Sequence, residues 1–176
     1  MHIIIDGYNL IRQSDELRRY ERVSLEEGRK ALIRDVSSYK KRKGHRVTVV
    51  FDGWVSGSPE EERDRSSGVN IIYSRKGEKA DDVIKRLANE RAEEIVVVTS
   101  DRDIADFVGR RGGTAVSSHQ FVELMAKART AVAHDSRDEE GRFQEDDEGR
   151  AGTKTKGPSK RLSRKKKSAM IKMRKL

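Results

Sequence analysis

Aspartates occur where the apolar segments of this chain end, and where one amphipathic segment begins. The six positions are Asp6, Asp52, Asp81, Asp82, Asp101 and Asp103, in the contexts IIIDG, VVFDG, KADDV and TSDRD. Carboxylates gathered at one place repel each other unless a cation neutralises them. Because the chain has no Cys and its four His are scattered, hard oxygen ligands favour Mg²⁺ or Mn²⁺ over zinc. The chemistry predicted is that of a divalent-metal site, provided that the fold brings these acids together.

Alternating strands and helices are predicted to position these acids. Short apolar runs rich in Val and Ile predict strands at 2–5, 46–51, 69–74, 94–100 and 114–118. Helical periodicity predicts helices at 25–43, 81–91 and 103–110, and a last one that Ser117 or Ser118 caps and that reaches about residue 129. The segment 52–68 is polar and rich in turn residues, which predicts a mobile loop.

A parallel α/β sheet covered by helices on both faces is the fold that this pattern favours, because the strands are almost continuously apolar. In such sheets, ligands bind beyond the carboxyl ends of the strands, near the point where the strand order reverses. Asp6, Asp52 and Asp101 would meet there, each from a different strand. Taken one at a time, each Asp is more typical of a helix cap or a turn. Acids at the same end of three strands nevertheless favour a site.

Other side chains near the same sheet edge could contact a substrate. Asn9 is expected to hydrogen-bond Asp6 or a substrate phosphate, or else to cap a helix. Tyr8 and Trp54 could stack on bases, with core packing as the alternative for Tyr8. Four cationic residues close in sequence to the acids are expected to hold a nucleic-acid backbone, or else to form a solvated face: Arg75, Lys76, Lys79 and Arg102.

The positive charge of the chain is concentrated at its C-terminal end. The net charge is +9, yet residues 150–176 hold twelve of the 39 Lys and Arg and no acid. The remaining 27 basic residues are outnumbered by 30 acidic ones, so residues 1–149 are slightly acidic. The tail is predicted to be disordered and to bind polyanions, because each phosphate contact releases a counterion. Its expected contacts are Lys160, Arg161, Arg164, Lys165, Lys166 and Lys167.

Three regions are predicted: a folded domain over 1–131, a disordered acidic linker over 132–149, and the basic tail. The absence of Cys excludes disulfides and thiolate metal sites. The sequence contains neither GxGxxG nor GxxxxGK[ST], which argues against dinucleotide-binding and P-loop proteins. No apolar run is long enough to span a membrane and no signal peptide is recognisable, so a cytoplasmic location is expected.

The motifs DGYN, FDG, ADD and TSDRD, in these positions, resemble the NYN domain, a branch of the PIN-like nucleases, and most closely the YacP-like ribonuclease group. The resemblance covers about residues 1–130. It implies a PIN-like three-layer α/β/α sandwich and a metal-dependent endoribonuclease with one or two Mg²⁺ or Mn²⁺ ions. Asn9 resembles the asparagine of DGYN, and Asp52 is not a standard member of the family's acidic cluster. The residues that resemble that cluster are Asp6, Asp81, Asp82, Asp101 and Asp103.

Some members of that group act on messenger RNA at the ribosome, so the resemblance names RNA as a partner and allows the ribosome as another. Asp6 and Asp101 are expected as direct metal ligands. Asp103 and one of Asp81 and Asp82 would complete the shell directly or through water, and the residues alone do not choose between the last two.

Two other functions remain open at this point. The first is a non-catalytic RNA- or ribosome-binding module, in which the tail supplies the affinity. The second is a small-molecule phosphohydrolase with an aspartyl nucleophile. This second function is disfavoured because Tyr8 stands where such enzymes place a second acid, two residues after the nucleophile.

Overall fold

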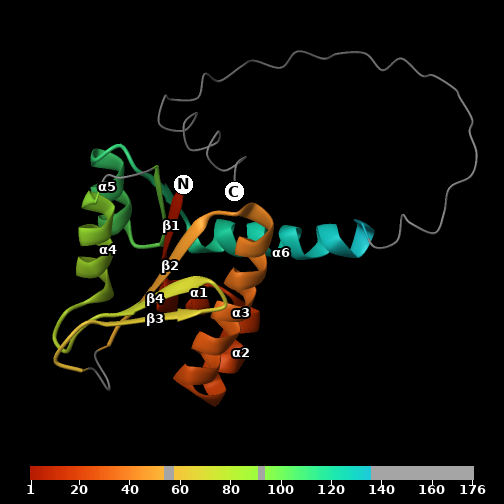
Figure 1. Ribbon diagram of the computed structural model, residues 1–176, viewed down its shortest axis with the longest axis horizontal. Coiled ribbons are helices and arrows are strands. Elements are labelled where there is room, and N and C mark those ends of the chain that lie inside the picture. Colours follow the sequence, from red (N-terminus) through yellow and green to blue (C-terminus); the bar gives the residue numbers. More distant parts are fainter. Residues whose placement is uncertain (54–57, 91–93, 136–176) are drawn as a thin grey trace, which may run out of the picture.

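Twelve helices and strands make up the described part of the chain (Figure 1). The structure is a computed structural model, and it describes residues 1–53, 58–90 and 94–135, with side chains as far as residue 129. In chain order the elements are β1 (His2–Asp6), α1 (Gly7–Arg12), α2 (Asp15–Val23), α3 (Leu25–Lys43), β2 (Arg46–Phe51), β3 (Glu62–Ser66), β4 (Val69–Tyr73), α4 (Ala80–Asn89), β5 (Ile95–Val98), α5 (Arg102–Arg110), β6 (Thr114–Val116) and α6 (Ser118–Asp135).

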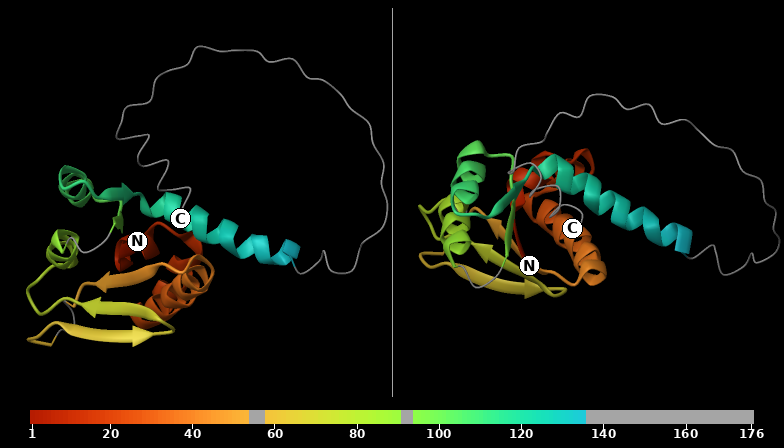
Figure 2. Two further views of the ribbon diagram at one scale, coloured as in Figure 1. Left: turned by 45° about the horizontal axis from the view of Figure 1, so that its top comes forward. Right: turned by 90° about the horizontal axis from the view of Figure 1, so that it is seen from above.

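The six strands form one sheet in the order β3-β4-β2-β1-β5-β6, and every neighbouring pair is parallel except β3 with β4. Helices α4 and α5 cover one face, whereas α1, α2, α3 and α6 cover the other (Figures 1 and 2). The predicted three-layer α/β/α sandwich with a mostly parallel sheet is therefore confirmed. The strand order reverses at β1, which lies between β2 and β5 and ends at Asp6.

The central strand β1 is buried on both of its faces. Ile3 and Ile5 pack with Val36 of α3 in the core on one side of the sheet, and Ile4 packs with Ile84 of α4 in the core on the other side. Such two-sided burial explains why β1 reads as an uninterrupted apolar run instead of an alternating one. It also fixes the strand end from which the first carboxylate projects.

The prediction of a mobile loop over 52–68 is wrong for residues 62–66. These residues form β3, an antiparallel edge strand that pairs with β4. Its side chains are mostly charged and exposed, which removes the apolar alternation that would have predicted a strand and also discourages pairing with other chains. Ser67 and Gly68 have φ angles of 50° and 81°, and they form the tight turn between β3 and β4.

The sequence pattern does not predict α1 or α2, which join β1 to α3. Helix α2 buries only Leu17, so it carries no apolar stripe. Ser14 caps α2 by accepting a hydrogen bond from the Leu17 N–H at 3.3 Å. The last helix, α6, begins at Ser118 as predicted but extends to Asp135, beyond the predicted boundary at residue 131.

Several predicted features lie outside the described residues, namely Trp54, most of the acidic linker and the basic tail. Within the ranges that the structure describes, no helix is both long and apolar enough to cross a membrane.

Candidate active site

Asp6 stands at the end of β1, where the strand order reverses, and its side chain is only 9% exposed. One carboxylate oxygen accepts a hydrogen bond from the Asn9 N–H at 3.2 Å, so Asp6 is the N-cap of α1. The other accepts a hydrogen bond from the Thr99 hydroxyl at 3.4 Å. Asp6 thus lies at the carboxyl edge of the sheet, as expected, and it also caps a helix.

Burial raises the pKa of Asp6 from 3.8 to about 6, because the ionised carboxylate loses its water. The negative charges of Asp81 and Asp52 raise this pKa further, whereas the hydrogen bonds from Asn9 and Thr99 oppose the shift. The side-chain charges that act most strongly on this pKa are those of the carboxylates Asp81 and Asp52. Among the described residues, Asp6 is therefore a buried carboxylate beside other carboxylates and without an ion-pair partner, which is the electrostatic environment that a cation would stabilise.

The charge of Asp81 acts on Asp6 and is itself influenced by the charges of Asp101 and Asp52. Burial raises the pKa of Asp81, the charges of Asp101 and Asp52 raise it further, and Lys85 lowers it. Asp82 points elsewhere: it is exposed and lines an open depression together with Arg75 and Lys76. Sequence could not choose between the two neighbours in ADD. Asp81 is close enough to Asp6 and Asp101 for their charges to interact, whereas the exposed Asp82 lines the open depression.

Asp101 is the N-cap of α5. One of its carboxylate oxygens accepts hydrogen bonds from the N–H groups of Asp103 and Ile104, at 2.7 and 3.4 Å. Its second oxygen accepts no hydrogen bond from a residue in the described ranges. Asp103 is exposed in the first turn of α5. Capping and site formation, which sequence treated as alternatives, are thus compatible at Asp101.

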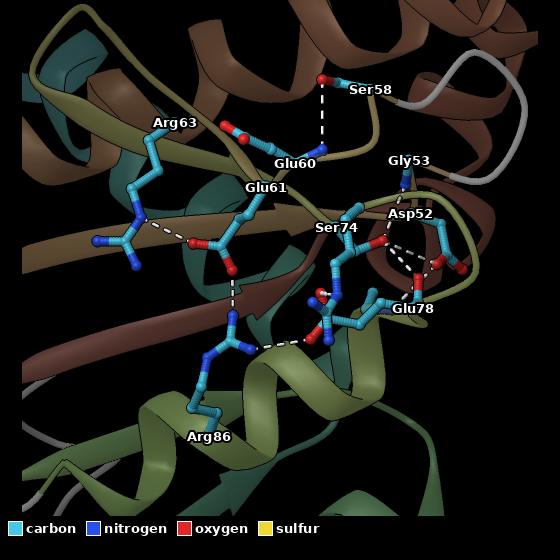
Figure 3. A network of polar contacts seen from close by, with 11 residues as sticks. Asp52, Gly53, Ser58, Glu60, Glu61, Arg63, Ser74, Glu78 and Arg86 are labelled. Carbon is cyan, nitrogen blue, oxygen red and sulfur yellow. Dashed lines mark hydrogen bonds and ion pairs between the residues drawn. The ribbon is translucent and has the colours of Figure 1, made fainter.

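Asp52 supports α4, the helix that carries Asp81. One of its carboxylate oxygens accepts a hydrogen bond from the Ala80 N–H at 2.9 Å, which replaces the missing side-chain cap at Lys79. The same oxygen lies 3.4 Å from the Ser74 hydroxyl. Figure 3 shows Asp52 next to Ser74 in this network of polar contacts. Asp52, which is not a standard member of the family's acidic cluster, thus has a supporting position in the structure.

Further polar contacts fix the segment between β4 and α4. The Ser74 hydroxyl donates to the Glu78 carbonyl at 2.7 Å and accepts from the Gly53 N–H at 3.0 Å. Arg86 of α4 pairs with Glu78 at 2.8 Å and with Glu61, next to the start of β3 (Figure 3). The first turn of α4 is consequently held from two sides, and Asp81 with it.

Asn9 connects three parts of the site through its side-chain carbonyl oxygen. This oxygen accepts hydrogen bonds from the Ser118 hydroxyl at 2.7 Å and from the Ser100 N–H at 3.0 Å. Asn9 therefore joins α1 to the β5–α5 connection and to the start of α6. Sequence did not predict the involvement of Thr99 or Ser118, although the TSD motif placed Thr99 two residues before Asp101.

We expect Asn9→Ala to lower the free energy of unfolding by about 2 kcal/mol, because the buried Ser118 hydroxyl and the Ser100 N–H lose their acceptor. RNA cleavage should fall with it, since the segment that carries Asp101 loses an anchor. Urea denaturation and a cleavage assay measure the two effects. Gln120→Ala is the matched control, because its carbonyl oxygen accepts from Ser117 at an exposed position. A control loss equal to that of Asn9→Ala would contradict the anchoring role.

The predicted nucleic-acid contacts divide into two groups. The first group consists of four exposed cationic residues, namely Arg75, Lys76, Lys79 and Arg102. The Nε atom of Arg75 lies 3.6 Å from Oε2 of Glu78. Tyr8 is half-buried: its ring packs edge-on against Phe51, and its hydroxyl accepts a hydrogen bond from Arg29 Nε at 2.8 Å. Tyr8 therefore packs against the core, as the alternative expectation for it proposed.

The donor set at this edge has the chemistry that a hydrated divalent ion takes, but it is not a preformed cluster among the described residues. Asp6, Asp81 and Asp101 supply hard oxygen ligands whose charges repel each other. As the side chains lie, no three His, Asp or Glu residues among those described are close enough together to hold a metal ion. Mg²⁺ usually keeps several waters and takes one or two carboxylates, so three direct protein ligands are not required.

The fold and this acidic sheet edge define a PIN-like nuclease-type domain. The sequence matches the YacP-like NYN domain family over residues 3–175, and the chain belongs to that family. It is 37% identical, over 103 residues, to the uncharacterized protein YacP of Bacillus subtilis (strain 168). That alignment covers 56% of this chain and 59% of the relative, so the chain matches less than two thirds of the relative's length.

Two solved structures have a similar fold. The crystal structure of a single-residue mutant of Rae1 (YacP) from Bacillus subtilis has a TM-score of 0.67 and 26% identity, covering 82% of this chain and 86% of that one. A second crystal structure of Rae1 (YacP) from the same organism has a TM-score of 0.65 and 28% identity, covering 78% and 80% of the two chains.

Proposed function

We propose that this protein is an endoribonuclease that hydrolyses RNA phosphodiester bonds with the help of Mg²⁺ or Mn²⁺. The observation that carries the proposal is that Asp6 and Asp101 follow the adjacent parallel strands β1 and β5 at the reversal point of the sheet, with Asp81 close enough to both for their charges to interact. Membership of the YacP-like NYN family supports the same chemistry. A cytoplasmic location, and cleavage of messenger RNA on the ribosome, belong to the proposal as well.

The residues of the site divide into those that would hold the ion and those that position them. Asp6, Asp81 and Asp101 would hold the ion directly or through its waters, with Asp103 further out. A bound divalent ion would neutralise charge on the phosphate and lower the pKa of a water that attacks phosphorus. Thr99 and the Asn9 N–H orient the Asp6 carboxylate, and Asp52 holds the helix that presents Asp81. No side chain needs to act as a covalent nucleophile.

The Asp81 and Asp82 pair gives a sharp test of the site. We expect Asp81→Asn to lower the rate of RNA cleavage about 100-fold, which corresponds to about 2.7 kcal/mol of lost transition-state stabilisation. Asp82→Asn should stay within about threefold of the wild type, since its side chain faces a different depression. Both variants remove one charge from the same helix turn, so each controls for the other. Equal losses in both would contradict the assignment of Asp81.

A non-catalytic RNA- or ribosome-binding module is the second candidate. The observation in its favour is that the described side chains do not form a ready-made group of three metal ligands. The test is cleavage of a labelled single-stranded RNA with Mg²⁺, Mn²⁺ or EDTA, followed by the same assay on translating ribosomes. Metal-dependent cleavage supports the nuclease. Binding without cleavage under every condition supports the module.

A further inference from the structure

A groove lies between α3 and the hairpin formed by β3 and β4, away from the depression lined by Asp82. Its cavity volume is about 410 Å³, within the range of sites that bind small molecules or single nucleotides. One wall is a single face of α3 and the other is the edge hairpin. None of the residues discussed as metal ligands lines this groove. It is therefore a separate surface whose purpose the acidic site does not explain.

Arg29 stands at the end of the groove nearest to the acidic site. Its guanidinium carbon lies 5.4 Å from the centre of the Tyr73 ring, 5.7 Å from that of Tyr8 and 5.9 Å from that of Phe51. Its Nε donates a hydrogen bond to the Tyr8 hydroxyl at 2.8 Å. The three rings stand one or two residues from Asp6, Asp52 and Ser74, at the same carboxyl end of the sheet. The rings hold the guanidinium rigidly beside the proposed site.

The two terminal nitrogens of Arg29 are free to bind a ligand, because no residue in the described ranges accepts a hydrogen bond from either of them. Arg29 forms no ion pair with a carboxylate of those residues, although its charge helps to lower the pKa of Glu26, for which Lys30 is the main cause. A guanidinium that is held in place while two adjacent NH₂ groups stay unpaired has the geometry for bidentate binding of a phosphate.

The rest of the groove also favours a polyanion. Four cationic side chains line it against two acidic ones, Glu26 and Asp64. Lys30 pairs with Glu26 at 2.7 Å, which neutralises one of the acids. Lys41, about three turns along α3 from Arg29, is exposed and forms no ion pair with a described residue. The two unpaired cations, Arg29 and Lys41, thus mark two separated points along one groove.

The groove has an apolar floor between these cations, formed by Ile33 and Ile71, with Tyr73 at the end near Arg29. Ile33 and Ile71 are 7% and 4% exposed, so the partly exposed Tyr73 ring is the part of this lining on which a base of a single strand can stack while its phosphates contact the rim. In an RNA duplex the bases are stacked inside the helix and only the backbone and groove edges are accessible. The combination of a cationic rim and an apolar floor therefore selects single-stranded RNA over duplex.

We propose that this groove binds single-stranded RNA, with Arg29 and Lys41 each on a phosphate, and that it receives the part of the strand that flanks the bond to be cut. The second half of this statement rests on the proposed nuclease function, but binding can be measured without cleavage. The groove would fix the path of the strand across the sheet edge and would add affinity that does not depend on the basic tail.

The test measures binding of the full chain to a labelled single-stranded RNA of about 12 nucleotides in EDTA. We expect Arg29→Gln to weaken binding about tenfold and Lys41→Gln about threefold. Each variant should also reduce the slope of log affinity against log salt by about 0.7, the value for one lost phosphate contact on a single strand. Arg22→Gln is the matched control, because it removes the same charge from an exposed position on α2. A duplex of the same sequence should be bound equally by all four proteins.

Unchanged affinity and salt slope in both Lys41→Gln and Arg29→Gln would contradict RNA binding by the groove. Equal losses of affinity in Arg22→Gln would contradict it as well. Lys41 is exposed, so its variant tests the groove even if Arg29→Gln folds poorly. Cleavage distinguishes the two proposals. If the wild type cleaves RNA but the groove variants bind RNA normally, the proposal of RNA binding by the groove is contradicted and the proposed nuclease function is supported. If the groove variants lose RNA binding but neither they nor the wild type cleaves RNA, the proposal of RNA binding by the groove is supported and the proposed nuclease function is contradicted.

Discussion

Asp6→Asn is expected to abolish RNA cleavage, with a loss of at least about 100-fold, and at the same time to make the metal-free protein more stable. Both effects have one cause. Asp6 is an ionised carboxylate that is buried and faces the charges of Asp81 and Asp52, so the folded state holds its negative charge poorly. An amide removes that charge and can still accept the hydrogen bond that Asn9 donates. The shift of the pKa from 3.8 to about 6 corresponds to at most about 3 kcal/mol of stability at neutral pH.

The sign of this effect gives a pH dependence. Between about pH 4 and pH 6 the folded protein binds more protons at Asp6 than the unfolded chain does, so the contribution of Asp6 to stability falls as pH rises through this window. Wild type and Asp6→Asn should therefore have similar free energies of unfolding below about pH 4 and should differ most above about pH 6. Urea denaturation in EDTA at several pH values measures the difference. A variant less stable than wild type at neutral pH would contradict the electrostatic strain at this site.

Gly53→Ala is expected to lower the free energy of unfolding by about 3 kcal/mol or more. A Cβ atom at Gly53 would lie 1.8 Å from the Ser74 carbonyl oxygen, and this neighbour is backbone that cannot turn away. Relief requires β2 and the chain after β4 to separate. That movement would break the hydrogen bond from Gly53 to Ser74 and disturb the support that Asp52 gives to α4. Activity should therefore fall further than stability alone explains.

Gly109→Ala is the control for this substitution. Nothing lies within 4 Å of a Cβ at Gly109, and the residue is in the last turn of α5 with an ordinary φ angle. Alanine there should leave stability unchanged or raise it by up to about 1 kcal/mol. Thermal or urea unfolding of the two variants side by side tests the steric argument. Equal stability of Gly53→Ala and wild type would show that the close approach between the two strand ends is not essential.

Sequence predicted the parts of the fold whose signals are local. Ser24 accepts a hydrogen bond from the Glu27 N–H at 3.1 Å and begins α3, and Gly44 ends α3 with a φ angle of 69°. The uninterrupted apolar run of β1 predicted a strand buried on both faces, with Asp6 at its end. Because parallel strands end at the same edge, the placement of Asp6 and Asp101 at one edge of the sheet could be predicted without any knowledge of distances.

The features that sequence did not predict depend on tertiary contacts. β3 has charged, exposed side chains and becomes a strand only because β4 offers it a pairing edge. Asp81 and Asp82 have the same chemistry, and only the direction of α4 separates them. The Asn9 side chain could not be assigned to Ser118, since 109 positions separate the two in the chain. The cationic groove likewise requires the packing of α3 against the β3–β4 hairpin.

The central claim is that the acidic edge of the sheet hydrolyses RNA with a divalent ion. It is tested most directly by the cleavage of labelled single-stranded RNA, free and on translating ribosomes, by the wild type and by Asp101→Asn in Mg²⁺, Mn²⁺ and EDTA. Asparagine can still cap α5, so this variant should fold. We predict cleavage by the wild type that requires the metal and disappears in Asp101→Asn. Cleavage that persists in EDTA or in the variant would contradict the claim, as would no cleavage of either substrate with either metal.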